Sequence, residues 1–151
     1  MKSIGVQLFL NEIQEKLIPF SVLKSEIKPD KGWVNAIRIA VKMSLRQLGE
    51  RLHITPQGVR DLEKREKEGA ITINTLKEVG RVLDMDLVYG FISRHNSLEE
   101  MIEERAREIA EEVVLKAIKL DNQKNSENDL KKAIQQKTYE ISSKMPSNLW
   151  D

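Results

Sequence analysis

Residues 44–66 read SLRQLGERLHITPQGVRDLEKRE, and this stretch decides the fold. In its first part, leucines recur at spacings of three and four residues, which is the apolar repeat of an amphipathic helix; they are Leu45, Leu48 and Leu52. Val59 and Leu62 continue a helical pattern in the second part. The stretch therefore predicts two short helices in succession.

Hydroxyl side chains mark where both helices begin. Ser44 stands directly before the first leucine, where it can act as an N-cap. Thr55 stands before Pro56, at a first helical position where proline loses no hydrogen bond. Only His53 and Ile54 separate the first helix from the second cap. This order predicts a helix-turn-helix motif, whose second helix is shaped to enter the major groove of DNA.

Further helical segments lie on both sides of the motif. Their apolar positions recur at helical spacing; they are Trp33, Ile37 and Val41 before the motif, and Leu76, Val79 and Leu83 after it. Thr72 can cap the later segment. Because the connections are short, we expect a compact helical bundle.

The motif resembles the lambda-repressor-like (Xre-type) helix-turn-helix, with its hydroxyl cap, its Val59 and its Leu62-Glu63 pair. Longer stretches resemble the mobile mystery protein A family; they are GWVNAIRIAVKMSLRQLGERL (32–52), LEKREKEGAITINTLKEVGRVLDMDLVYGFISR (62–94), SLEEMIEERAREIA (97–110) and the Leu149-Trp150 terminus. This resemblance covers essentially the whole chain. It implies a DNA-binding regulator paired with a Fic-domain toxin encoded beside it, and it makes Glu63 a structural residue near the base of the bundle.

Two positions depart from the lambda-repressor-like pattern. Many such repressors have glutamine directly after the first cap, where it contacts a phosphate, but this chain has Leu45. Their turn usually carries glycine, which tolerates a positive φ, but this chain has His53. These departures concern the phosphate clamp and leave the fold unaffected.

The first turn of the second motif helix supplies the residues that we expect to touch base edges, because this turn faces the bases in such docking. The candidates are Pro56, Gln57, Gly58, Arg60 and Asp61. Gln57 can bond bidentately to adenine, and Arg60 can bond to guanine or a phosphate. Gly58 has two interpretations: a close approach of the backbone to DNA, or a tolerated weak helix former.

A second set of polar and basic residues is placed to reach phosphates. They flank the motif helices or follow the second one; they are Arg38, Lys42, Arg46, Gln47, Thr55, Lys64, Arg65 and Lys67. The alternative for the basic members is a solvated surface that aids solubility. The motif thus predicts double-stranded operator DNA as a partner.

The charge is unevenly distributed along the chain. The total of 25 basic and 24 acidic residues gives only +1. Residues 32–95 carry 11 basic and 8 acidic groups, whereas residues 96–151 carry 9 basic and 12 acidic groups. A basic centre followed by an acidic tail is compatible with DNA binding despite the near-neutral total.

The segment MDLVYGFISR, residues 85–94, alternates in the manner of a short strand and is rich in β-forming residues. A lone strand leaves its backbone groups unpaired, so the same strand of a second copy is the simplest partner. This predicts a homodimer with Leu87, Val88, Tyr89 and Phe91 in the shared strand. The alternative is a continued helix in which Gly90 is a defect.

From Ser97 the pattern is again helical, with Ser97 and Glu100 spaced as a capping box. An apolar stripe follows, at Ile102, Ala106, Ile109, Val113, Ala117 and Leu120. The first turns are rich in glutamate, which the helix dipole favours there; an acidic face that docks on a basic partner is the alternative. Residues 121–129 predict a loop, and Leu130, Ile134 and Ile141 predict one more helix.

The sequence gives no sign of catalysis, of a cofactor or of a metal site. It has two histidines, no cysteine and no GxGxxG, P-loop or HExxH motif. No apolar run approaches the roughly 20 residues that span a bilayer, and the N-terminus makes a poor signal peptide. We therefore expect a cytoplasmic, non-enzymatic protein without a membrane partner.

The expected fold is mainly α: a lambda-repressor-like helix-turn-helix bundle with a short β-strand and helical N- and C-terminal extensions. The expected divisions are an N-terminal helix ended by Pro19 and a linker (1–31), the DNA-binding domain (32–95) and the C-terminal extension (96–151). Two function classes remain open: a dimeric repressor of its own operon that is also an antitoxin, and an interaction module that neutralises a toxin, with DNA binding secondary.

Overall fold

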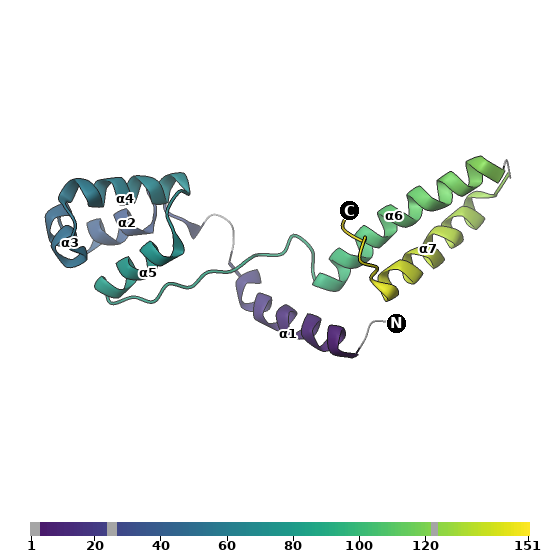
Figure 1. Cartoon of the computed structure of the whole chain (residues 1–151), viewed down its shortest axis with the longest axis horizontal. Helices are drawn as coiled ribbons and strands as arrows, with labels where there is room; N and C mark the ends of the chain where they lie inside the picture. The colour runs from purple at the N-terminus through teal and green to yellow at the C-terminus, as the bar shows by residue number, and fades with distance from the viewer. Residues whose placement is uncertain (1–3, 24–26, 122–123) are drawn as a thin grey trace. The chain divides into compact units, whose positions relative to one another are not determined.

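The computed structural model describes residues 4–23, 27–121 and 124–151, which are mainly helical (Figure 1). The helices are α1 (Ile4–Ser21), α2 (Trp33–Ala40), α3 (Leu45–Leu52), α4 (Pro56–Glu68), α5 (Ile73–Val82), α6 (Leu98–Asp121) and α7 (Glu127–Lys144). They form two compact units. The central unit is Leu23–Gly90, and the terminal unit combines Met1–Val22 with Phe91–Asp151. The expected mainly α fold is confirmed.

Three hydroxyl caps begin the helices of the central unit, as the sequence predicts. The Ser44 side chain accepts a hydrogen bond from the Gln47 backbone N–H at 3.1 Å, and Thr55 accepts one from Gly58 at 3.0 Å. Thr72 likewise accepts from the Thr75 N–H at 3.1 Å. Each cap satisfies an N–H group that the first turn of a helix leaves without a partner, so α3, α4 and α5 begin where local chemistry places them.

The turn between α3 and α4 is tight. His53 ends α3 in the left-handed region with φ 56°, the conformation that glycine commonly supplies at such a position. The chain then passes so close to α3 that a Cβ added to Gly49 would lie 2.6 Å from the Ile54 carbonyl oxygen. The turn therefore depends on the missing side chain of Gly49 as well as on His53.

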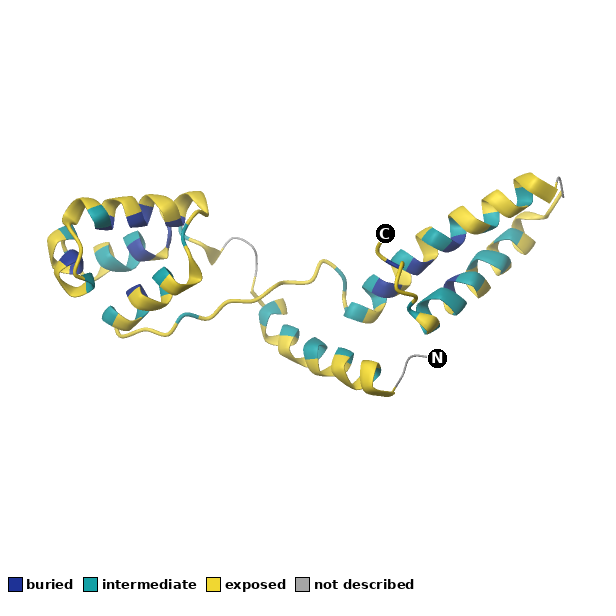
Figure 2. Cartoon of the chain, in the orientation of Figure 1, coloured by how far each residue is buried: buried dark blue, intermediate teal, exposed yellow. Residues whose placement is uncertain are grey.

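The core of the central unit is small and apolar. It consists of buried side chains from four helices, namely Val34, Leu48, Val59, Leu62 and Val79. Figure 2 shows buried stretches, in dark blue, on the helices of this unit. At the N-terminal end of α2 the residue that enters the core is Val34 rather than the expected Trp33, which is 46% exposed, and Val41 is also exposed.

A carboxylate from α4 caps the N-terminus of α2. The two oxygens of Glu66 accept hydrogen bonds from the backbone N–H groups of Trp33 and Val34 at 2.7 and 2.9 Å. Gly32 precedes them with φ 87°, and a Cβ there would lie 2.8 Å from the carboxylate. Glu66 therefore joins the first and third helices of the central unit by a charge-assisted contact.

The terminal unit is built around α6. Its neighbour α7 runs alongside it (Figure 1). Buried Ile102, Ala106 and Leu149 form its core, and Leu10 of α1 packs against them. Arg105 fastens the C-terminal segment by donating to the Leu149 carbonyl oxygen at 2.8 Å.

The structure corrects several details of the terminal unit. Pro19 lies inside α1 instead of ending it: the helix continues to Ser21, and a proline so near its C-terminal end removes only one backbone donor. The stripe expected on α6 drifts: Ala110 is buried, whereas Val113 and Leu120 are 44% and 86% exposed. The buried residues Ile102, Ala106 and Ala110 recur every four residues, so the covered face turns by about 40° at each step relative to the 3.6-residue helical repeat and leaves the positions chosen from the sequence.

Two predicted connections are described only in part. In the linker expected before residue 32, residues 24–26 lie outside the described residues, as do 122 and 123 in the loop expected at 121–129. At the latter, α6 continues to Asp121 and α7 begins at Glu127. Ser126 is its N-cap, accepting from the Asp129 N–H at 3.2 Å.

The β-strand expected after α5 is absent from the described residues. Residues 85–92 are neither helical nor paired as a strand. The physical reason is that a strand requires a hydrogen-bonded neighbour, and within the described parts of this chain no other segment supplies one. The alternative of a continued helix is also wrong, since α5 ends at Val82.

Within the described ranges, no helix combines the length and the apolar character needed to cross a membrane.

The Gly49 contact leads to a first prediction. Gly49→Ala should lower the free energy of unfolding of the central unit by about 1–3 kcal/mol, because the new methyl group must displace the Ile54 carbonyl. Urea unfolding of the whole chain, followed by circular dichroism, measures this. Gly5→Ala is the control, since a Cβ there meets no atom within 4 Å. Unfolding of Gly49→Ala at the wild-type urea concentration would contradict the prediction.

Candidate nucleic-acid interface

The first turn of α4 is open to solvent. Pro56 occupies the first helical position, and Gln57, Arg60 and Asp61 are all exposed. The Gln57 amide nitrogen donates to an Asp61 carboxylate oxygen at 2.9 Å, one helical turn away. The four side chains thus lie along one exposed edge of α4, and Asp61 fixes the direction of the Gln57 amide.

Gly58, the remaining base-facing candidate, is held close to its own helix cap. A Cβ at this position would lie 3.3 Å from the Thr55 hydroxyl oxygen and 3.4 Å from the Ile54 Cβ. This close packing within the chain by itself explains why the position is occupied by glycine. It favours a local requirement of the turn over a merely tolerated weak helix former.

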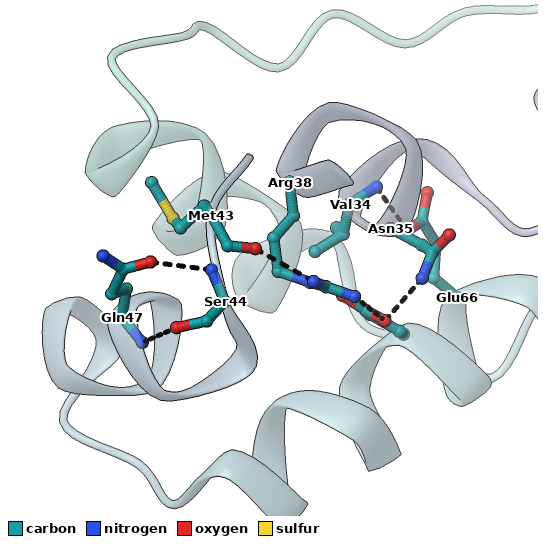
Figure 3. Close-up of polar contacts among 8 residues, drawn as sticks. Val34, Asn35, Arg38, Met43, Ser44, Gln47 and Glu66 are labelled. Atoms are coloured by element: carbon teal, nitrogen blue, oxygen red, sulfur yellow. Dashed lines mark hydrogen bonds and ion pairs between the residues drawn. The ribbon is translucent and has the colours of Figure 1, made fainter. Parts of the chain in front are cut away.

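Arg38 does not belong to the phosphate-contacting set. Its guanidinium pairs with the Glu63 carboxylate at 2.6 Å and also donates to the Met43 carbonyl oxygen at 3.0 Å. Only 11% of the Arg38 side chain and 9% of the Glu63 side chain is exposed. Asn35 also donates to Glu63, at 2.8 Å. Figure 3 shows the Arg38 guanidinium engaged in these contacts; because it is paired and largely buried, we assign it to the fold instead of to phosphate contact. The structural role expected of Glu63 is confirmed.

Gln47 completes a reciprocal cap at the start of α3. Its side-chain oxygen accepts from the Ser44 backbone N–H at 2.8 Å, while its own N–H bonds the Ser44 hydroxyl (Figure 3). The Gln47 amide nitrogen has no hydrogen-bond partner among the described residues. Gln47 therefore caps the N-terminus of α3 with its backbone N–H and side-chain oxygen. Its exposed side-chain NH₂ group remains available as a hydrogen-bond donor.

The other phosphate candidates fall into two groups. Arg46 and Lys64 form exposed ion pairs with glutamates one turn away, Glu50 and Glu68. The second group makes no ion pair with any described residue; its members are Lys42, Arg65 and Lys67, together with Arg60 of the base-facing set. These free cations are exposed and able to bind an anion at no electrostatic cost to the fold.

A shallow hollow of about 420 Å³ lies beside the start of α3. Lys42 and Gln47 line it from either side of the Ser44 cap. Among the described residues, no group of acidic and histidine side chains is arranged to hold a metal ion.

The four residues assigned to the dimer strand follow the last helix of the central unit. Val88 and Tyr89 are 75% and 63% exposed, Phe91 is 83% exposed, and Leu87 is half-buried. Leu87 and Val88 also line an apolar groove of about 540 Å³ next to Trp33 and Leu83. The segment is therefore attached to the core at its start and exposed further on.

Sequence reasoning missed two residues that shape this interface. Glu66 sets the position of α2 against α4, yet in the sequence it is one of several charged residues in a run. Gly49 allows the turn to close; its signal was a glycine inside an otherwise regular helical pattern, which indicates a close approach of backbone.

Comparison with known proteins agrees with this geometry. Residues 34–89 match the family model described as helix-turn-helix, which spans α2 to α5 and the start of the segment that follows. The match identifies this part of the chain as a DNA-binding regulatory domain of the Xre, lambda-repressor-like type. Searches of curated proteins and of solved structures found no match.

The Arg38–Glu63 pair can be tested by unfolding. Glu63→Gln should lower the free energy of unfolding by about 3–5 kcal/mol, because it leaves the buried Arg38 charge unpaired. In the double variant Arg38→Met/Glu63→Met the loss should be smaller than the sum of the single losses. Arg46→Ala, which breaks an exposed pair, should cost less than about 1 kcal/mol. Equal losses in urea unfolding for Glu63→Gln and Arg46→Ala would contradict a buried pair.

Proposed function

We propose that this helix-turn-helix regulator is a dimeric, sequence-specific repressor that binds the promoter of its own operon. The observation that carries the proposal is the exposed first turn of α4, flanked by cations that form no ion pair with any described residue. In a helix-turn-helix, that turn enters the major groove while the preceding helix crosses the backbone. Base recognition and phosphate binding are thereby divided between α4 and the residues around it.

Gln57 and Arg60 are the base-reading residues in this proposal. Gln57 offers an amide for adenine, and its hydrogen bond to Asp61 holds that amide before DNA arrives. Preorganisation of this kind reduces the side-chain entropy lost on binding. Asp61 therefore acts mainly by positioning Gln57, while Pro56 and Gly58 bring the backbone of α4 close to the groove.

Phosphate contacts come from α3, from α4 and from the segments that precede these helices; the residues are Lys42, Arg46, Gln47, Thr55, Lys64, Arg65 and Lys67. Arg46 and Lys64 exchange their glutamate partners for phosphates at little cost, because 69% and 71% of their side chains are exposed and such surface pairs contribute about 0–1 kcal/mol. These contacts position the unit on the duplex without reading its sequence.

A second function, as the antitoxin of a Fic-domain protein, is favoured by the exposed apolar face of α1. Ile4, Leu8 and Phe9 are 81%, 64% and 63% exposed. No serine or threonine of the chain has glutamate four residues later, which is the spacing of the inhibitory motif of small Fic antitoxins. Inhibition of such a partner therefore requires a contact of another kind, for which the α1 face is the candidate.

The base-reading assignment predicts a sequence-dependent loss. Gln57→Ala and Arg60→Ala should each weaken binding to the promoter by about 1–3 kcal/mol while leaving binding to scrambled DNA unchanged. Lys64→Ala should weaken binding to both and reduce the salt dependence. Fluorescence anisotropy titrations at several salt concentrations separate these effects, with Lys116→Ala on α6 as the control. Absence of any promoter binding at low salt would refute the proposal that the protein is a repressor.

The antitoxin assignment predicts that substitutions on the α1 face disrupt toxin binding without affecting DNA binding. Leu8→Glu/Phe9→Glu should abolish co-purification with the adjacent Fic-domain protein, because a carboxylate cannot be buried unpaired in an apolar contact. Promoter binding should persist in this variant. Lys16→Ala on the same helix is the control. A Fic-domain protein that stays active and unbound beside the wild-type chain would remove the antitoxin function.

A further inference from the structure

The backbone of the segment from Asp86 to Arg94 is not paired with any other described part of the chain. None of its N–H or C=O groups is hydrogen-bonded to another described residue. Its apolar side chains are also exposed, up to 83% for Phe91. Unpaired backbone combined with exposed β-forming side chains is a template for pairing with another strand.

The sequence of this segment is nearly symmetric in character about Gly90. Antiparallel pairing with a second copy, centred on Gly90, places Asp86 of one copy opposite Arg94 of the other. The same register places Val88 opposite Ile92 and Tyr89 opposite Phe91. Cross-strand pairs of opposite charge, of β-branched residues and of aromatic residues all stabilise a sheet.

A two-fold axis generates these pairs twice, because residue i of one copy faces residue j of the other and the reverse also holds. A shift by one residue destroys the match: it sets Asp86 opposite Ser93 in one direction and Leu87 opposite Arg94 in the other. Charge complementarity therefore favours this register over the registers one residue away, and a second copy of the same segment supplies it.

We propose that residues 86–94 form a two-stranded antiparallel ribbon between two copies of this chain, with the two-fold axis at Gly90. One face of each strand carries Asp86, Val88, Ile92 and Arg94, and the other carries Leu87, Tyr89 and Phe91. A ribbon of two strands is marginal by itself. Here the half-buried Leu87 already lines the apolar groove beside Trp33, so one face of the ribbon begins against the core of the central unit.

The inference deepens the proposed dimeric repressor. It rests on that proposal only for the function of the ribbon, which is to bring two α4 helices to the two half-sites of an operator by a two-fold axis. Formation of the ribbon itself needs no DNA. The oligomeric state and the promoter binding are therefore measured separately, so that either proposal can fail alone.

Charge reversal tests the pair at the ends of the ribbon. Asp86→Arg and Arg94→Asp should each raise the dimer dissociation constant about tenfold or more, because each creates two like-charge pairs. The double variant Asp86→Arg/Arg94→Asp should restore the wild-type constant. Sedimentation velocity on the whole chain without DNA measures it, and circular dichroism checks folding. Wild-type dimerisation in both single variants, or no recovery in the double variant, overturns this register.

Cysteine cross-linking tests the axis, since the chain has no cysteine of its own. Gly90→Cys should form a disulfide between copies, because residues directly opposite in an antiparallel pair have Cα atoms about 4.5–5.5 Å apart. Val88→Cys should not, because the two copies of residue 88 are offset by four residues, about 13 Å. Adding Ile92→Cys to it should restore cross-linking. Tyr139→Cys, exposed on α7, is the control for random collision.

The outcomes separate the two proposals. A monomeric wild-type chain that still binds its promoter overturns the ribbon and leaves the regulator. A chain cross-linked through residue 90 that does not bind its promoter supports the ribbon and overturns the repressor. Equal cross-linking of the residue 88 and residue 90 variants overturns the two-fold axis at Gly90.

Discussion

The buried ion pair between Arg38 and Glu63 is the contact on which the central unit depends. It joins α2 to α4 inside a bundle whose apolar core is small, and Glu66 joins the same two helices one turn further along. Two charges in this position are stable only while both remain paired and hydrogen-bonded. The contact therefore sets one arrangement of α4 against the rest of the unit, and through α4 it sets the direction of the turn that we propose to face DNA.

Sequence reasoning succeeded where the determining interactions are local. Ser44, Thr55 and Thr72 cap their helices through bonds to residues three positions away, so the motif and its boundaries were visible from the sequence alone. Sequence reasoning failed where tertiary packing determines the role of a residue. Arg38 and Lys42 look alike as basic residues at helical spacing, yet one is buried against Glu63 and the other is exposed. Only the three-dimensional contact distinguishes a core cation from a phosphate-binding one.

The segment after α5 illustrates another limit of pattern reading. Alternation of apolar residues describes what a segment would form given a neighbour, not whether a neighbour exists. In a single chain, Val88 and Phe91 are exposed and the backbone of this segment is unpaired, so the alternating pattern does not form a strand. In the proposed ribbon, a second copy of the same segment supplies the neighbouring strand, and Asp86 then lies opposite Arg94.

Charge and symmetry together explain how a nearly neutral chain can recognise DNA. The central residues 32–95 carry a net +3, and several of their cations are engaged by glutamates. Few phosphate contacts per copy mean weak nonspecific binding, since that term grows with the number of phosphates neutralised. Joining two such units makes the second half-site contact intramolecular, and its effective concentration raises the affinity only where both half-sites are present at the right spacing. In the proposed dimer, a small positive charge therefore favours discrimination between DNA sites, because sequence-independent attraction contributes little to the binding free energy.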